Sequence, residues 1–484
     1  MSERYAHYIG GQWVAGDGEW FDNINPADST DIIGQFPQAT ESDVRRAANA
    51  AQEAFPLWRS LPAPSRGEFL AKAADVLERR LDEVATALVR EEGKTKAEAM
   101  GETNRGVVIL RYYATEGLHQ VGEVIPSTAP NTLLYTTRTP LGVVTLITPW
   151  NFPVAIPYWK AAPALVYGNT VLLKPSGLSP LTGHLMADVF HEAGLPPGVF
   201  NLIQGRARSI SDTLIDNGST RAVSFTGSAA TGKKIAVTAV GIGAKYQLEM
   251  GGQNPVIVMD DADLNQAVEL TVSGAMRSAG EKCTATSRAI VLDEIADDFT
   301  ENLVARVKSL KVGPGTDPDC YLGPVISEDA RQSILSYIRQ TQDEGATLAC
   351  GGGIPSGETY EKGFYVEPTV FTDVTPAMTL ACDEVFGPVL AVIKVRDFDE
   401  ALEIANGVTY GLSASIFTRD LNSVLAYTDG IEAGLIRVNG ETAGVEPQAP
   451  FGGMKGSSSY SREQGRAAMD FYTQIKTVYL QPSD

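Results

Sequence analysis

Two stretches of the chain carry residues that could perform nucleophilic chemistry. Glu249 lies beside Gly251 and Gly252, and Cys283 lies in the run Gly280-Glu281-Lys282-Cys283-Thr284. A thiolate is a strong nucleophile, but a free cysteine has a pKa of about 8.5 and needs a base near neutral pH. A carboxylate can take the proton from the thiol or from an attacking water, and the glycines would let the backbone approach a substrate closely. Composition alone favours a non-catalytic interpretation, in which Cys283 is a buried thiol and Glu249 a solvated carboxylate. Whether the two residues are catalytic must therefore be judged from other motifs of the chain.

A polar side chain at the end of a predicted buried strand could stabilise negative charge. The apolar strand 142–147 is followed by Thr148-Pro149-Trp150-Asn151-Phe152-Pro153. From such a place an asparagine can donate its side-chain N–H to an oxyanion that develops during nucleophilic attack. An isolated asparagine between prolines is more often a turn residue, so this prediction also needs support from other motifs.

A turn rich in glycine and serine follows another predicted strand and begins a helix, which is the arrangement that binds a pyrophosphate. The turn is Phe225-Thr226-Gly227-Ser228-Ala229-Ala230-Thr231-Gly232. The run from Gly227 to Lys233 also follows most of a P-loop. Lys234 stands where a Ser or Thr hydroxyl would hold Mg²⁺, so the sequence disfavours an ATPase.

The elements that must position these groups indicate an α/β protein. A chain of 484 residues is too long to fold around one hydrophobic core, so its length predicts two or three domains. Residues 1–40 indicate short strands and turns, and residues 41–116 indicate helices. From 142 onward strands and helices alternate, in one series that ends near 250 and a second that begins at 255 and includes a helix at 263–279. Two such series predict parallel sheets with a ligand cleft between them.

Composition argues against several classes of function. A formal net charge of −20 disfavours nucleic acids and anionic membranes as partners. The N-terminus has no apolar signal core, and proline and glycine interrupt the most apolar region near 161–174, so no membrane span is expected. The four cysteines form no C-x-x-C pair and no cluster with zinc spacing, which argues against a metal site and against a disulfide framework. We therefore expect a cytoplasmic protein in a reducing compartment.

In their order along nearly the whole chain, these motifs resemble those of the aldehyde dehydrogenase superfamily. The resemblance implies that Cys283 is the nucleophile, Glu249 the general base and Asn151 the oxyanion donor. It also implies that Lys160 assists proton movement and cofactor placement. The reaction would be the NAD(P)-dependent oxidation of an aldehyde to a carboxylate through a thiohemiacetal and a thioester on the cysteine. The retained glutamate argues against the branch of the family that transfers the acyl group to coenzyme A.

The same resemblance assigns the cofactor contacts. Lys174-Pro175-Ser176-Gly177 is similar to the adenosine-ribose segment, in which the lysine bonds ribose hydroxyls. The family usually has a glutamate where this chain has Gly177, and that carboxylate disfavours a 2′-phosphate. Its absence removes a like-charge repulsion, so we expect NADP to be accepted as well as NAD. The complete set implied for the cofactor is Ile147, Thr148, Pro149, Trp150, Lys174, Ser176, Gly177, Gly227, Ser228, Gly232, Leu248, Glu384 and Phe386.

The C-terminal runs 442–445, 450–458 and 462–465, with Cys283-Thr284-Ala285-Thr286-Ser287-Arg288, most resemble the α-ketoglutarate semialdehyde (2,5-dioxopentanoate) dehydrogenases. This implies a short aldehyde with a distal carboxylate, which needs a cation in the substrate tunnel. Arg277, on the predicted helix before the catalytic loop, matches a carboxylate-binding arginine of succinic semialdehyde dehydrogenases. For Arg105 and Arg111 we favour surface salt bridges. Succinic semialdehyde, glutarate semialdehyde and sugar-derived aldehydes remain open, and the other implied substrate contacts are Phe152 and Trp159.

The resemblance also implies an architecture and an assembly. A Rossmann-like cofactor domain would comprise residues 1–121 and 142–251, and an α/β catalytic domain would comprise residues 252–450. A small β element of residues 122–141 and 467–484 would join subunits into a homodimer or homotetramer. Its strands are expected at 131–138 and 475–480, where exposed edges favour pairing.

Two functions of other classes remain to be weighed. A non-catalytic, structural use of the fold is opposed by the intact set of Cys283, Glu249, Asn151 and Glu384. An esterase that needs no cofactor could use the same cysteine, glutamate and oxyanion donor. It would not need Lys174, the phosphate-binding turn or Glu384, so dependence on a nicotinamide cofactor separates the two activities.

Overall fold

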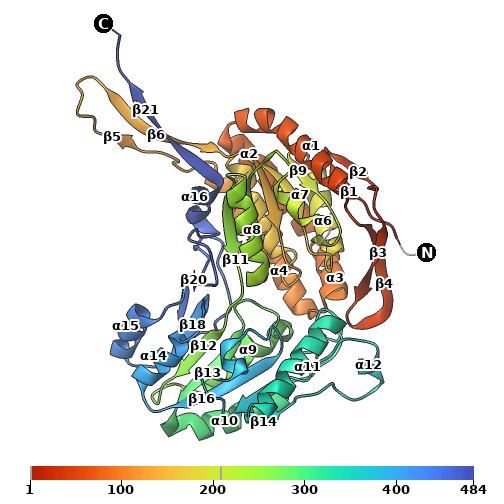
Figure 1. Cartoon of the computed structure of the whole chain (residues 1–484), viewed down its shortest axis with the longest axis vertical. Helices are drawn as coiled ribbons and strands as arrows, with labels where there is room; N and C mark the ends of the chain where they lie inside the picture. The colour runs from red at the N-terminus through yellow and green to blue at the C-terminus, as the bar shows by residue number, and fades with distance from the viewer. Residues whose placement is uncertain (1–2, 208–209, 484) are drawn as a thin grey trace.

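The computed structural model describes residues 3–207 and 210–483, and two seven-stranded sheets form its framework (Figure 1). The strands of the first sheet are β1 (His7–Ile9), β2 (Gln12–Val14), β7 (Val143–Ile147), β8 (Thr170–Lys174), β9 (Phe200–Leu202), β10 (Thr220–Thr226) and β11 (Lys245–Glu249). They lie in the order β11-β10-β7-β8-β9-β1-β2, and the strands from β11 to β9 are parallel. Ile147 pairs with both Phe225 and Lys174, and Thr226 pairs with Glu249. The strand ends that carry the predicted site residues therefore share one edge of the sheet.

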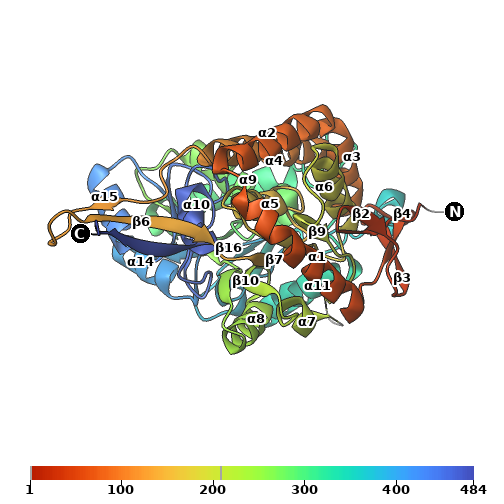
Figure 2. The same ribbon diagram turned by 90° about the horizontal axis from the view of Figure 1, so that it is seen from above.

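Helices cover both faces of this sheet because its strands alternate apolar side chains between two clusters. Val171 and Leu173 point into one cluster, while Leu172 points into the other. The first cluster is covered by α5 (Ala155–Val166) and α6 (Pro180–Glu192), with α2 (Ala63–Arg79), α3 (Leu81–Glu92) and α4 (Lys96–Glu116) outside them. The second cluster is covered by α1 (Glu41–Ser60), α7 (Ser211–Ile215) and α8 (Ala229–Gly241). Figure 2 shows the sheet between these helical layers.

The second sheet begins only a few residues after the first one ends. Its strands are β12 (Asn254–Val258), β13 (Thr286–Leu292), β14 (Thr347–Cys350), β15 (Thr369–Thr372), β16 (Val389–Val395), β18 (Ser413–Phe417) and β19 (Leu435–Val438). Their order is β14-β15-β16-β13-β12-β18-β19, with only β14 antiparallel. The helices of this half are α9 (Leu264–Met276), α10 (Asp293–Lys308), α11 (Glu328–Asp343), α12 (Glu358–Glu361), α13 (Thr379–Cys382), α14 (Phe398–Asn406) and α15 (Leu421–Gly430).

Smaller elements complete the fold. A three-stranded antiparallel arm projects from the molecule and carries the C-terminus (Figure 1); it is built from β5 (Val124–Ile125), β6 (Leu133–Pro140) and β21 (Thr473–Leu480), which follows α16 (Ala468–Tyr472). A hairpin is formed by β3 (Trp20–Asn25) and β4 (Asp28–Pro37), and a second antiparallel pair joins the distant strands β17 (Tyr410–Gly411) and β20 (Met454–Lys455). Within the described residues, no helix has the length and apolar character needed to cross a bilayer.

The α/β class predicted from the sequence is confirmed, but the helix predicted over 263–279 is too long. Helix α9 ends at Met276, and Arg277 begins a short 3-10 turn that runs to Gly280. Ser278 and Ala279 have left-handed backbone angles (φ 53° and 51°), which an α-helix cannot contain. Arg277 therefore leaves the helix axis at the entrance to the loop that carries Cys283.

Candidate active site

Cys283 lies between α9 and β13 and is half-buried. Its carbonyl accepts a hydrogen bond from Asn254 Nδ2 at the start of β12 (2.8 Å). Burial raises the pKa of Cys283 to about 12, and the nearby carboxylates of Glu384 and Glu249 act in the same direction. The thiol is therefore protonated at neutral pH in the free protein, and attack on a carbonyl requires a base.

Glu249, the last residue of β11, can serve as that base. It is buried, and Ser458 donates its hydroxyl to Oε2 (2.5 Å), while no described group bonds Oε1. Burial raises the pKa of Glu249 well above its usual value, and the charge of Glu463 adds to this effect. A carboxylate with a raised pKa and an open oxygen can accept a proton from a thiol or from water.

Lys160 lies on α5, whose residues are all buried, and it is neutralised by a residue that the sequence did not single out. Its Nζ bonds Glu463 Oε1 and Ser224 Oγ (2.8 Å), and Trp159 Nε1 donates to the other oxygen of Glu463 (2.7 Å). Because Glu463 also acts on the charge of Glu249, Lys160 belongs to one electrostatic unit with the base. The signal for Glu463 was available in principle, since a lysine inside an apolar helix requires a carboxylate partner.

Asn151 is held against the loop of the nucleophile. Its Nδ2 donates to the carbonyl of Glu281 (3.0 Å), two residues before Cys283, and Lys94 Nζ donates to the carbonyl of Asn151. An amide NH₂ has two N–H groups, so one donor remains for a substrate oxygen. The expected oxyanion donor thus lies in the same hydrogen-bonded unit as the nucleophile.

A cavity of about 260 Å³ opens beside Cys283 and contains all three predicted substrate residues in its wall. Phe152 and Trp159 line it together with Phe451, whose ring centroid lies 5.3 Å from that of Trp159. Arg277 is exposed, and its guanidinium carbon lies 4.8 Å from the centroid of the Tyr321 ring. The cavity therefore has aromatic walls and a cation at its rim.

The surface salt bridge expected for Arg111 is confirmed, but the one expected for Arg105 is wrong. Arg111 pairs with Glu78 (2.5 Å) and Asp75 (3.6 Å). Arg105 is half-buried in the wall of the cavity and has no carboxylate within 4.0 Å in the described part of the chain. It follows Gly101 by one helical turn of α4, and both residues line the cavity.

The glycines of the two catalytic stretches serve a different purpose from the one expected. A Cβ at Gly251 would overlap the carboxylate of Glu384, and one at Gly280 (φ +70°) would overlap the carbonyl of Gly387. These glycines therefore allow segments of the protein to meet, where the sequence suggested close approach of a substrate.

The carboxyl edge of the first sheet has the features that an adenosine diphosphate moiety requires. Ser228 caps the N-terminus of α8, and its Oγ accepts from Thr231 N (3.4 Å). A Cβ at Gly227 would lie 2.6 Å from the Phe225 ring, and one at Gly232 2.7 Å from Met250 Sδ, so both positions need glycine. Burial lowers the pKa of Lys174 to about 7, and this residue has no carboxylate partner in the described chain. A helix N-terminus and an unpaired lysine together fit an anionic cofactor.

The remaining predicted cofactor residues flank the catalytic loops. Ser176 Oγ accepts from Leu178 N (3.1 Å) within its own turn, and the buried hydroxyl of Thr148 has no described partner. Glu384 Oε1 accepts from Gly252 N (3.0 Å), and burial raises the pKa of Glu384 to about 7. Phe386 (φ +55°) contacts Trp150 edge to face, with the two ring centroids 5.6 Å apart. Ile147, Pro149 and Leu248 complete the strand ends around them, with Leu248 buried.

The raised pKa of Cys283 makes a prediction about its reactivity. Alkylation by iodoacetamide, followed by mass spectrometry of the Cys283 peptide, should accelerate about tenfold per pH unit between about pH 6 and pH 9, because the thiolate fraction is still rising there. In Glu249→Gln the rate should be higher at each pH, since one of the carboxylates that raise the pKa is gone. A rate that levels off below about pH 8 would contradict the protonated thiol.

Comparison with known proteins agrees with this geometry. A profile of the aldehyde dehydrogenase family matches residues 13–478. The chain is 52% identical to an α-ketoglutaric semialdehyde dehydrogenase of Bacillus subtilis over 479 residues, which cover 99% of this chain and 98% of that one. It is 46% identical to an α-ketoglutarate semialdehyde dehydrogenase of Haloferax volcanii, with 99% of both chains covered. The fold matches the crystal structure of Staphylococcus aureus betaine aldehyde dehydrogenase in complex with NAD+, with a TM-score of 0.96, 35% identity, and 99% of this chain and 95% of that one covered. This chain belongs to the aldehyde dehydrogenase family.

Proposed function

We propose that this aldehyde dehydrogenase oxidises a short aldehyde with a distal carboxylate, α-ketoglutarate semialdehyde above all, to the corresponding acid. The observation that carries the proposal is the pair of arginines, Arg105 and Arg277, which border the cavity beside Cys283 without carboxylate partners among the described residues. A guanidinium binds a carboxylate through two parallel hydrogen bonds, and the half-burial of Arg105 strengthens the attraction at that residue. The identity to α-ketoglutarate semialdehyde dehydrogenases of two organisms supports the same substrate.

The charge of the cavity also favours an acidic substrate. Four cationic side chains and three carboxylates line it, so the lining carries one net positive charge inside a chain of formal charge −20. The cations are Lys94, Arg105, Arg277 and Lys282, and the carboxylates are Glu98, Glu102 and Glu441. A locally positive pocket in an acidic protein attracts an anion that the rest of the surface repels.

In the proposed mechanism, Glu249 removes the proton of the Cys283 thiol through its unbonded Oε1, and the sulfur attacks the aldehyde carbon. The free N–H of Asn151 and the backbone N–H of Cys283 would bind the oxyanion. Bound NAD or NADP, held by Lys174, the Gly227–Gly232 turn and Glu384, supplies the hydride acceptor. After Glu249 has released the thiol proton to solvent, its carboxylate takes a proton from the water that hydrolyses the thioester, and the acid leaves as Cys283 recovers its thiol.

We further infer that the cofactor site accepts NADP. A Cβ at Gly177 would lie 3.3 Å from Cγ of Arg206, an exposed residue whose backbone N–H donates to Gln38 Oε1 (2.7 Å). Position 177 therefore offers no carboxylate and lies beside a cation, which suits a 2′-phosphate on the ribose.

The domain roles and the assembly belong to the same proposal. Residues 1–121 with 142–251 would bind the cofactor, residues 252–450 would complete the catalytic site, and residues 122–141 with 467–484 would join two or four copies. Exposed apolar side chains on both faces of the arm support this assembly, among them Val124, Leu133, Ile475, Tyr479 and Leu480. A cytoplasmic location is supported by the four free cysteines.

The substrate proposal predicts a selective effect of the two arginines. Arg105→Met and Arg277→Met should each lower kcat/KM for α-ketoglutarate semialdehyde by about tenfold or more, which is the value of one charge-assisted hydrogen bond. The rate with a neutral aldehyde of the same length should change little. Arg111→Met, which breaks only a surface pair, is the matched control. If kcat/KM fell equally for the acidic and the neutral aldehyde, Arg105 and Arg277 would not bind the carboxylate of the substrate.

The cofactor proposal predicts a change in preference. Gly177→Glu should lower kcat/KM for NADP by about tenfold or more and leave that for NAD nearly unchanged, because the new carboxylate repels a 2′-phosphate and can pair with Arg206. Arg206→Met should act in the same direction, with Arg221→Met as the control for an exposed arginine on the same sheet. If both substitutions change kcat/KM for NAD and NADP by the same factor, Gly177 and Arg206 do not determine whether a 2′-phosphate is accepted.

A further inference from the structure

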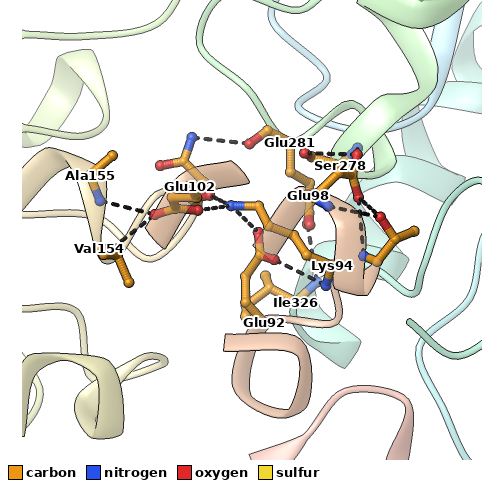
Figure 3. Close-up of polar contacts among 11 residues, drawn as sticks. Glu92, Lys94, Glu98, Glu102, Val154, Ala155, Ser278, Glu281 and Ile326 are labelled. Carbon is orange, nitrogen blue, oxygen red and sulfur yellow. Dashed lines mark hydrogen bonds and ion pairs between the residues drawn. The ribbon is translucent and has the colours of Figure 1, made fainter. Parts of the chain in front are cut away.

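The segment from the end of α3 to the first turns of α4 carries charged residues inside the protein, a costly arrangement that calls for a function. Glu92, Lys94 and Glu102 are almost completely buried, and Glu98 is half-buried. Charged side chains are rarely buried unless they are paired. Figure 3 shows these residues between the two loops of the active site, where Lys94 contacts Glu92 and Glu102, and Glu98 bonds Ser278.

One half of the cluster holds the loop that contains Asn151. Lys94 Nζ bonds Glu102 Oε2 (2.6 Å) and the carbonyl of Asn151, and it lies 4.0 Å from the ring centroid of Phe152. The other oxygen of Glu102 accepts from the backbone N–H groups of Val154 (2.9 Å) and Ala155 (3.1 Å). Glu102 thus caps α5, which has no side-chain cap of its own, and together with Lys94 it holds the chain that follows the asparagine side chain.

The other half holds the loop that contains Cys283. Glu98 Oε1 accepts from Ser278 N (2.8 Å), and Glu98 Oε2 closes the capping box of α4 with Thr95. Ser278 is the first of two residues with left-handed backbone angles, which cost free energy unless neighbouring groups hold them. Glu98 therefore stabilises the strained turn just before Cys283.

The Asn151–Glu281 hydrogen bond connects the two halves, since Asn151 Nδ2 donates to a carbonyl between the strained turn and Cys283. We infer that Lys94, Glu98 and Glu102 are positioning residues that set the Asn151 amide relative to the Cys283 sulfur and thereby determine how well the oxyanion is bound. The inference rests on the proposed oxyanion role of Asn151. None of the three needs to touch the reacting atoms, because each acts through the backbone of a loop.

A double-mutant cycle tests the inference, with the first-turnover formation of reduced NAD from propanal as the readout. Propanal needs no carboxylate anchor, so the result does not depend on the identity of the natural substrate. Asn151→Ala should slow this step by about a hundredfold, the usual value of one oxyanion donor, and Lys94→Met by about tenfold or more. The double variant should be no slower than Asn151→Ala alone, because with a neutral aldehyde the inference has Lys94 affect this step through that amide.

A purely structural role of the cluster would give a different pattern. The effects of the two substitutions would then multiply, and that result would overturn the inference; an Asn151→Ala variant of normal rate would overturn both the inference and the proposed oxyanion role. The alkylation rate of Cys283 and the KM for NAD should stay within about threefold in Lys94→Met, since the nucleophile and the cofactor site are intact.

Two further variants keep the test decisive if Lys94→Met does not fold. Glu98→Gln keeps an acceptor for Ser278 N and should restore most of the rate that Glu98→Ala loses, whereas equal rates of these two variants would contradict a role for that hydrogen bond. Lys96→Met is the control, because Lys96 lies at the start of the same helix but its ammonium makes exposed contacts with Asp82 (2.8 Å) and Thr86 (2.6 Å), away from both loops. Its first-turnover rate should equal that of the unchanged protein, and a loss like that of Lys94→Met would overturn the specific role of Lys94.

Discussion

The hydrogen bond from Asn151 Nδ2 to the carbonyl of Glu281 (3.0 Å) joins the two halves of the site. Asn151 follows β7 of the first sheet, and Glu281 belongs to the loop that leads into β13 of the second sheet. Nucleophile, base and oxyanion donor come from segments far apart in the sequence, so their relative placement depends on contacts that cross between the sheets. The chain also passes from Glu249 at the end of β11 to Asn254 at the start of β12 within a few residues, which fixes the base at the same junction.

Charged groups are buried where the two sheets meet, and this burial affects both the ion pairs and the nucleophile. Lys160 with Glu463 and Lys94 with Glu102 are buried ion pairs, and each pair lies beside a group proposed for catalysis. Removing either partner would leave a charge without compensation in the interior, which costs far more than a surface pair contributes. Burial, reinforced by the carboxylates of Glu384 and Glu249, raises the pKa of Cys283, so the thiol is kept neutral until a base acts. A protein that holds its nucleophile in this state protects it from oxidation and alkylation at neutral pH.

The features that follow local patterns could be predicted from the sequence. The alternation of strands and helices gave the α/β class, and Cys283, Glu249 and Asn151 were found because each follows or precedes a strand in a recognisable run of residues. Features that depend on distant partners could not be predicted. Glu463 meets Lys160 across 303 positions of the sequence. Nothing near Arg105 reveals that its face of α4 borders a cavity, and the end of α9 at Met276 depends on left-handed residues for which neither Ser278 nor Ala279 is a typical type.

The central claim of this account is that oxidation of an acidic aldehyde leaves its acyl group as a thioester on Cys283, and that Glu249 is needed to hydrolyse this thioester. The most direct measurement is mass spectrometry of Glu249→Gln after it has been mixed with α-ketoglutarate semialdehyde and NAD or NADP. Because Glu249 also takes the thiol proton, acylation in this variant should be slow and proceed through the small thiolate fraction of Cys283. The account predicts that an acyl adduct nevertheless accumulates on the Cys283 peptide, with one reduced nicotinamide formed for each adduct and no further turnover. Continued turnover without an adduct, or an adduct on Cys320, Cys350 or Cys382 in its place, would contradict it.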